Sequence, residues 1–217
     1  QRLRGFYRQH LSAFKDSHTI PPSILAGHEL YHSWLFELNK HDPATTGLPR
    51  LATYGHYSEC VGLGVTDVGG GNRNWTDNGN GTFTIGNNDE GISDLSLYLS
   101  GFASPEEVRP FFVIENPNVP QNQPYPVCSI TGREGETISG TKKTVTIQQI
   151  IQQYTPRNPS SVLSRKVFNI GVVLLVDNKN NITNSDMIKI RRLLQTAPEW
   201  FNNHTWCRRV INYPIHL

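Results

Sequence analysis

Residues 28–32 read His-Glu-Leu-Tyr-His, and this spacing constrains the fold of the chain more than any other feature of the sequence. In an α-helix, side chains four residues apart lie on the same face, so His28 and His32 can reach one metal ion. Neutral imidazole suits zinc, and Glu29 then faces the water that a catalytic zinc site keeps in its open position. The pattern predicts a zinc-binding helix with Glu29 as the general base.

Local signals place this motif in a helix over residues 22–38. Pro21 and Pro22 suit a helix start, and the polar residues before Pro43 end the run. Residues with helical spacing form the buried face: Ile24, His28, Tyr31, Leu35 and Leu38. The alternative is a half-buried helix whose histidines only make hydrogen bonds.

A catalytic zinc site usually takes three protein ligands. The candidates for the third ligand are His41, His56, Glu90 and Asp94. The segment with Glu90 and Asp94 is similar to the Asn-Glu-x-x-Ser-Asp pattern of thermolysin-like peptidases, although Asp89 stands in place of the Asn. The metzincin pattern is excluded, because Leu35 and Leu38 stand where it requires Gly and His.

Further segments form a longer pattern: His-Glu-Leu-Tyr-His-Ser-Trp at 28–34, Gly-His-Tyr-Ser at 55–58, Gly-Gly-Asn-Arg-Asn-Trp at 70–75, Asp-Asn-Gly-Asn-Gly-Thr-Phe at 77–83, Ile-Ser-Asp-Leu-Ser-Leu-Tyr-Leu-Ser-Gly at 92–101, and Ser-Pro-Glu-Glu-Val at 104–108. The pattern resembles a family of secreted zincin-like HExxH proteins that are known largely from bacterial genomes. The resemblance continues through residues 145–147 and 168–176, so it covers most of the chain.

The resemblance implies a zincin-like fold and favours His56 as the third ligand, because the family has a histidine at that position. The family also has an acidic residue where this chain has Ser96. Either Asp94 or Glu90 takes over the role of that residue, or the protein is inactive.

We expect an α+β fold with a zincin-like active-site helix, short strands, a hairpin and a C-terminal β-α-β element. The expected helices cover residues 2–14, 22–38, 92–99, 148–154 and 185–201, the last capped by Ser185 and either kinked or restarted at Pro198. The expected strands cover residues 83–85, 111–114, 144–147, 172–176 and 210–215. Residues 104–107 are expected to form a capped turn, and residues 77–81 a hairpin turn in preference to a calcium loop.

The proline-rich segment 116–126 suggests a boundary. It separates a zincin-like metal-site region, residues 1–115, from a C-terminal α/β scaffold region, residues 116–217. We expect these two regions to pack as one catalytic domain.

Charge and hydropathy narrow the range of partners. The net charge of +2 is too small to indicate nucleic-acid binding. No apolar run approaches the roughly 20 residues that cross a bilayer. The chain opens at Gln1 in mid-pattern, and we expect it to be a mature or excised piece of a longer secreted protein. Its oligomeric state is left open.

Cysteines and sequons bear on an extracellular location. Cys60, Cys128 and Cys207 allow one disulfide with one cysteine left over. Four Asn-x-Thr glycosylation acceptors are present, at Asn74, Asn80, Asn181 and Asn203.

The predicted reaction is zinc-dependent hydrolysis of peptide bonds, with a peptide or protein as substrate. Tyr57 and Tyr98 are candidate oxyanion donors by residue type, and the alternative is that each is a packing aromatic. A second class of function is a secreted binding or surface module with a zincin-like fold that cleaves nothing.

Overall fold

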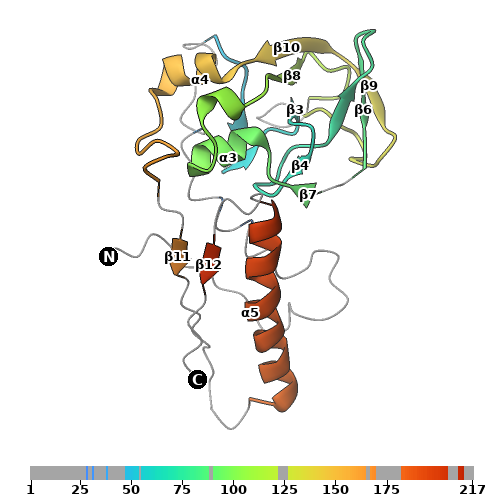
Figure 1. Cartoon of the computed structure of the whole chain (residues 1–217). Helices are drawn as coiled ribbons and strands as arrows, with labels where there is room; N and C mark the ends of the chain where they lie inside the picture. Colours follow the sequence, from blue (N-terminus) through green and yellow to red (C-terminus); the bar gives the residue numbers. More distant parts are fainter. Residues whose placement is uncertain are drawn as a thin grey trace. The chain divides into compact units, whose positions relative to one another are not determined.

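The computed structural model describes residues 28, 31, 38, 47–53, 55–87, 90–121, 127–164, 167–169, 182–204 and 210–212. These residues mix helices and short strands in an α+β arrangement (Figure 1). The chain divides into two compact units: residues 1–30 with 165–217, and residues 31–164.

The first unit contains β11 (Val167–Asn169), α5 (Asn184–His204) and β12 (Val210–Asn212). β11 and β12 pair in parallel, and α5 connects them in sequence and contacts β12. This is the β-α-β order expected from the sequence. Residues 172–176, where the central strand was expected, lie outside the described residues.

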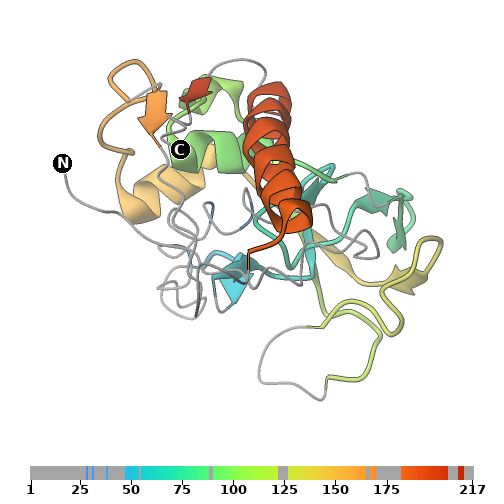
Figure 2. The same ribbon diagram turned by 90° about the horizontal axis from the view of Figure 1, so that it is seen from below.

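The helix α5 begins earlier than the sequence predicted. The hydroxyl of Thr183 accepts a hydrogen bond from the backbone N–H of Asp186, and the Asp186 carboxylate accepts one from the backbone N–H of Thr183. This reciprocal pair caps the helix, so the prediction that Ser185 is the cap was wrong. α5 continues through Pro198 as one helix (Figure 2).

The second unit consists of small sheets. β1 (Ala52–Thr53) pairs with β2 (His56–Tyr57), and β4 (Thr66–Asp67) pairs with β7 (Glu90–Gly91). One three-stranded sheet has β8 (Phe111–Glu115) between β3 (Val61–Gly62) and β10 (Thr141–Val145). The other has β6 (Thr82–Ile85) between β5 (Trp75–Asp77) and β9 (Thr137–Ser139).

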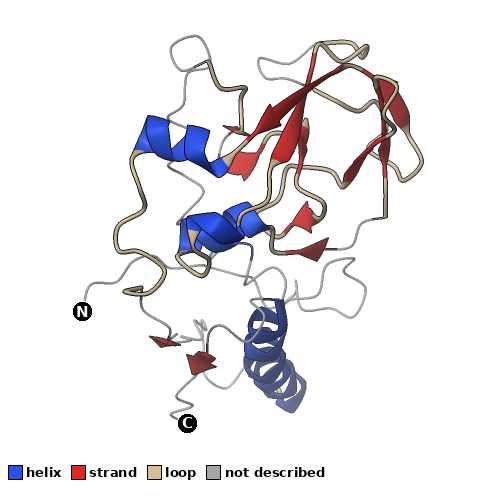
Figure 3. Cartoon of the chain, turned by 45° about the horizontal axis from the view of Figure 1, so that its top comes forward, coloured by secondary structure: helices blue, strands red, loops and turns tan. Residues whose placement is uncertain are grey.

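Two helices, α3 (Asp94–Ser100) and α4 (Ile147–Tyr154), lie at one end of this unit, and the β5–β6–β9 sheet lies at the other (Figure 3). Ser93 caps α3, and Thr146 caps α4 in a capping box with Gln149. The 3-10 turn η3 (Pro105–Glu107) begins with a capping box between Ser104 and Glu107, as the sequence predicted.

Gly140 links the two three-stranded sheets, because β9 ends before it and β10 begins after it. A Cβ atom at this position would lie 2.6 Å from Cγ2 of Ile114. Between the two sheets, the ring of the buried Phe83 on β6 stacks on the ring of the half-buried Phe112 on β8, with centroids 5.5 Å apart. The predicted boundary at residue 116 falls between β8 and β10, which are neighbouring strands of one sheet, and it stays a prediction.

Candidate functional site

The structure describes three residues of the predicted 22–38 helix. His28 has helical backbone and is half-buried, and Tyr31 is helical and fully buried. Leu38 lies in a 3-10 turn and is buried. Glu29 and His32 lie outside the described residues, as does the candidate ligand His41, so their roles stay predictions.

His56, the favoured third ligand, lies on β2 opposite Thr53 and is half-buried. The glycines that follow β4 pack against this strand. The carbonyl of Gly70 accepts a hydrogen bond of 2.9 Å from the backbone N–H of Tyr57. A Cβ atom at Gly71, which has φ +92°, would lie 2.0 Å from the carbonyl oxygen of Tyr57. Only glycine fits this approach, so the Gly-Gly segment supports the strand that carries His56.

Close to β2 lies a buried carboxylate that the sequence pattern did not indicate. Asp67, on β4, is 2 % exposed. Its Oδ1 accepts hydrogen bonds from the backbone N–H of Gly69 at 2.7 Å and from the hydroxyl of Ser96 at 3.0 Å. Its Oδ2 accepts one of 2.7 Å from the backbone N–H of Ser93. We call Asp67, Gly69, Ser93, Ser96 and Tyr57 the Asp67 cluster.

Tyr57 belongs to the cluster through Ser96. The two hydroxyl oxygens lie 2.8 Å apart in the interior. Ser96 has one hydroxyl proton and donates it to Asp67, so Tyr57 must be the donor in its bond with Ser96. A chain of hydrogen bonds therefore leads from the phenol of Tyr57 through Ser96 to the carboxylate of Asp67.

Burial sets the electrostatics of this cluster. Desolvation raises the pKa of Asp67 above its ordinary value, and the hydrogen bonds from Ser93, Gly69 and Ser96 oppose that rise. Burial also raises the pKa of Tyr57 well above its ordinary value, and the nearby charge of Asp67 adds to this effect. The phenol of Tyr31 is a further group that raises the pKa of Tyr57.

The cluster gives position 96 a definite role. A carboxylate there would stand beside the carboxylate of Asp67 in the interior, where two like charges repel strongly. A serine instead donates to the carboxylate and accepts from the phenol. The resemblance implies an acidic side chain at position 96 itself. In this chain the carboxylate is that of Asp67, and Ser96 donates a hydrogen bond to it.

The other acidic candidates, Asp94 and Glu90, lie next to the Asp67 cluster in the fold, on α3 and on β7. Asp94 forms an ion pair of 2.6 Å with Arg109. Since Ser93 is the N-cap of α3, Asp94 occupies the first turn of that helix. Glu90 is half-buried on β7, opposite Thr66 on β4.

The two candidate oxyanion donors are buried. Tyr57 is 2 % exposed and donates its hydroxyl proton to Ser96. Tyr98 is 4 % exposed, and its hydroxyl accepts a hydrogen bond of 3.0 Å from the backbone N–H of Arg157. Both contacts fit the alternative that these residues are packing aromatics.

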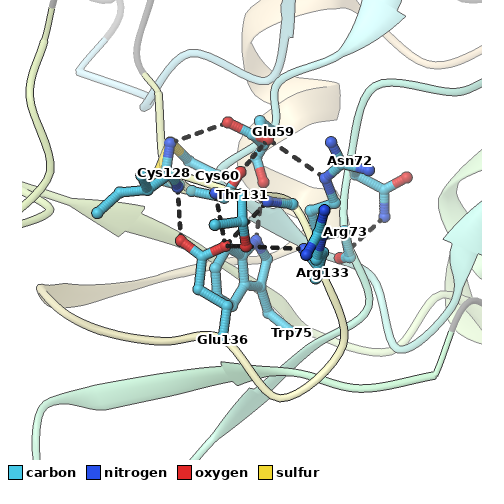
Figure 4. Close-up of polar contacts among 12 residues, drawn as sticks. Glu59, Cys60, Asn72, Arg73, Trp75, Cys128, Thr131, Arg133 and Glu136 are labelled. Atoms are coloured by element: carbon cyan, nitrogen blue, oxygen red, sulfur yellow. Dashed lines mark hydrogen bonds and ion pairs between the residues drawn. A yellow bond between two sulfur atoms is a disulfide. The ribbon is translucent and has the colours of Figure 1, made fainter.

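A second polar cluster anchors the start of β3 (Figure 4). Cys60 and Cys128 form a disulfide, and Glu59 lies beside it. The Glu59 carboxylate accepts hydrogen bonds from Arg73 Nε at 3.2 Å and from the backbone N–H of Cys128 at 3.1 Å. Trp75 Nε1 donates to the Glu59 carbonyl at 2.8 Å. These bonds tie the segment before β3 to β5 and to the loop that contains Cys128.

Local sequence signals reveal only part of the Asp67 cluster. Asn72, in the Gly-Gly-Asn segment, accepts from the backbone N–H of Asp67 and donates to the carbonyl of Val65, so it closes a tight loop. Asp67, the glycines at 69–71 and Asn72 lie close together in the sequence, and these residue types indicate such a turn. No local pattern indicates that Ser96, 29 residues away, completes the carboxylate's partners.

No family model, curated protein or solved structure matches the chain. Within the described ranges, no group of three or more His, Cys, Asp or Glu side chains is arranged to hold a metal ion. Nor does any helix in that part of the chain have the length and apolar character to span a membrane.

Replacing Ser96 with Ala is expected to lower the free energy of unfolding by about 1–3 kcal/mol, because Tyr57 and Asp67 each lose a buried partner. Urea denaturation measures the change. Ser100→Ala is the matched control, since among the described residues the Ser100 hydroxyl bonds only carbonyls of its own helix, and it should cost less than about 1 kcal/mol. Equal losses in the two variants would contradict the proposed hydrogen-bond chain.

The raised pKa of Asp67 predicts a pH dependence with a definite sign. The contribution of Asp67 to stability is fully present below the pKa that the residue has in the unfolded chain. It is lost as pH rises through the pKa that the residue has in the folded chain. The free energy of unfolding of the wild type, relative to Asp67→Asn, should therefore fall as pH rises above about 4. Denaturation at a series of pH values measures this difference.

Asp77→Asn is the control for the pH series. A hydrogen bond from Lys142 lowers the pKa of Asp77. Its contribution is therefore present above the unfolded pKa and is lost as pH falls through the folded pKa, which is the opposite sign. If the free energy of unfolding of the wild type, relative to Asp67→Asn, stays constant or rises with pH, the claim that burial raises the pKa of Asp67 is contradicted.

Proposed function

We propose that the chain is a zinc-dependent peptidase that hydrolyses peptide bonds with Glu29 as general base. The observation that carries this proposal is the His-Glu-Leu-Tyr-His stretch at 28–32. The helical backbone at His28 and Tyr31 is compatible with the helix that this spacing needs.

We assign the three metal ligands as His28, His32 and His56. The two described members of this ligand set, His28 and His56, are half-buried, as suits a metal ligand that a substrate must reach. The resemblance to the zincin-like family supports the inclusion of His56, because that family has a histidine at this position. Glu90, Asp94 and His41 remain the alternatives for the third position.

The chemistry of this donor set fits zinc, since neutral imidazole nitrogens are among its preferred ligands. Zinc, when bound, supplies a Lewis acid and a water with pKa near ~7. Glu29 accepts the proton of the attacking water and passes it to the leaving amine. Tyr57, Ser96 and Asp67 hold β2 in place and do not touch the substrate in this account.

The proposed substrate is a peptide or protein outside the cell. The disulfide between Cys60 and Cys128 supports a secreted location, because such bonds persist in oxidising compartments.

The second candidate function is a secreted binding module that keeps a zincin-like fold without catalysis. Two observations favour it. First, Ser96 replaces the acidic residue that the resemblance implies. Second, the nearby carboxylate of Asp67 already accepts hydrogen bonds from Gly69, Ser93 and Ser96. The presence of Glu29 favours the peptidase, since a module without catalysis has no use for a general base.

Replacing Glu29 with Gln separates the two candidates. The variant keeps the size of the side chain but cannot accept the proton, so peptide cleavage should fall by about 10²–10⁴-fold. The bound zinc per chain should stay unchanged. Cleavage of a quenched peptide library, measured beside metal content, gives both quantities.

The matched control is Glu90→Gln, which changes a second glutamate and should leave cleavage and metal content unchanged if His56 is the third ligand. A wild type that binds zinc but cleaves nothing in the library would favour the binding module. Full cleavage by Glu29→Gln would overturn the role of Glu29.

A further inference from the structure

The β5–β6 hairpin carries two Asn-x-Thr sequons, and the structure distinguishes between them. Asn80 lies in the turn between the strands and is exposed. Its Oδ1 accepts hydrogen bonds from the backbone N–H of Thr82 at 3.1 Å and from the Thr82 hydroxyl at 2.6 Å. Among the described residues, none accepts a hydrogen bond from Nδ2 of Asn80. The amide nitrogen of this sequon is therefore available for modification.

Asn74, just before β5, differs in this respect. It is half-buried, and its Nδ2 donates to both the backbone carbonyl and the side-chain oxygen of Asn87, at 3.2 Å each. A substituent on this nitrogen replaces one of its two N–H groups, so it would have to break at least one of those contacts. The fold thus occupies the nitrogen of one sequon and leaves that of the other exposed.

The surroundings of Asn80 also leave room for a large substituent. A Cβ atom at Gly79 would meet no atom within 4 Å, and one at Gly81 would meet only the Gly140 carbonyl, at 3.8 Å. The turn itself is well ordered by hydrogen bonds, because Asn78 donates to the hydroxyls of Thr82 and Thr84. A sugar on Asn80 can therefore extend into solvent while the hairpin keeps its contacts.

We propose that Asn80 is an N-glycosylation site of the folded chain and that Asn74 is not. The co-substrate is an oligosaccharide linked to a lipid diphosphate, and the catalyst is an oligosaccharyltransferase. Nδ2 of Asn80 forms a bond to the anomeric carbon of the first sugar. The bond from that carbon to the diphosphate oxygen breaks, the lipid diphosphate leaves with the electron pair, and the amide loses one proton to a base of the transferase.

The test compares the folded and the unfolded chain with one enzyme. Full-length, unglycosylated protein with its disulfide intact is incubated with a single-subunit oligosaccharyltransferase and lipid-linked oligosaccharide. A second sample is reduced and alkylated before the incubation, so that every sequon becomes accessible. Peptide mass spectrometry after treatment with peptide N-glycosidase in heavy-oxygen water measures the occupancy of each asparagine.

In the folded chain we expect modification at Asn80, with an initial rate at Asn74 that is lower by about tenfold or more, a factor that corresponds to ~1.4 kcal/mol. In the unfolded chain both sites should react. Asn80→Gln should abolish the modification of the folded hairpin, and Asn74→Gln should leave it unchanged.

Three outcomes would overturn the proposal. They are equal rates at the two sites in the folded chain, an unmodified Asn80 in the folded chain when the unfolded chain reacts there, and no reaction at Asn80 in either sample.

Discussion

The rest of the second unit depends on the buried carboxylate of Asp67. Removing a carboxylate from water costs several kcal/mol unless its oxygens find donors. No described Lys, Arg or His side chain forms an ion pair with it, so two backbone N–H groups and the hydroxyl of Ser96 compensate for the lost water. Each of these donors has to point at one of the two carboxylate oxygens. The start of α3 and the loop after β4 are therefore held against each other by one side chain.

The same constraint extends to the strand that carries His56. Ser96 links the carboxylate to the phenol of Tyr57, while Gly70 and Gly71 bring the loop after β4 against the backbone of β2. These contacts support the backbone at the half-buried His56, and a well-supported backbone is a condition that a metal ligand needs. The disulfide of Cys60 and the bonds of Glu59 then tie the following residues to β5 and to a distant loop.

Sequence patterns predicted the elements whose signals are local. The 75–85 hairpin, the capping box at Ser104 and the helix after Thr146 rest on residues within a few positions of one another, and the structure contains all three. The Asp67 cluster joins residues 29 and 39 positions apart, and the disulfide spans 68, so no local pattern could show which side chains meet. The cap of α5 was misplaced by two residues because Thr183 and Ser185 are both good caps and only the backbone distinguishes them.

The proposed ligand set of His28, His32 and His56 should hold one zinc ion, and the metal content of the chain is the measurement that decides this. Elemental mass spectrometry of the purified chain, after exposure to zinc and removal of loosely bound metal, gives the zinc bound per molecule. We expect about one zinc per chain in the wild type, as for a single site, and loss of that zinc in His56→Ala. Zinc retained in full by His56→Ala would contradict the ligand assignment, and a wild type that binds no zinc would contradict the proposed function.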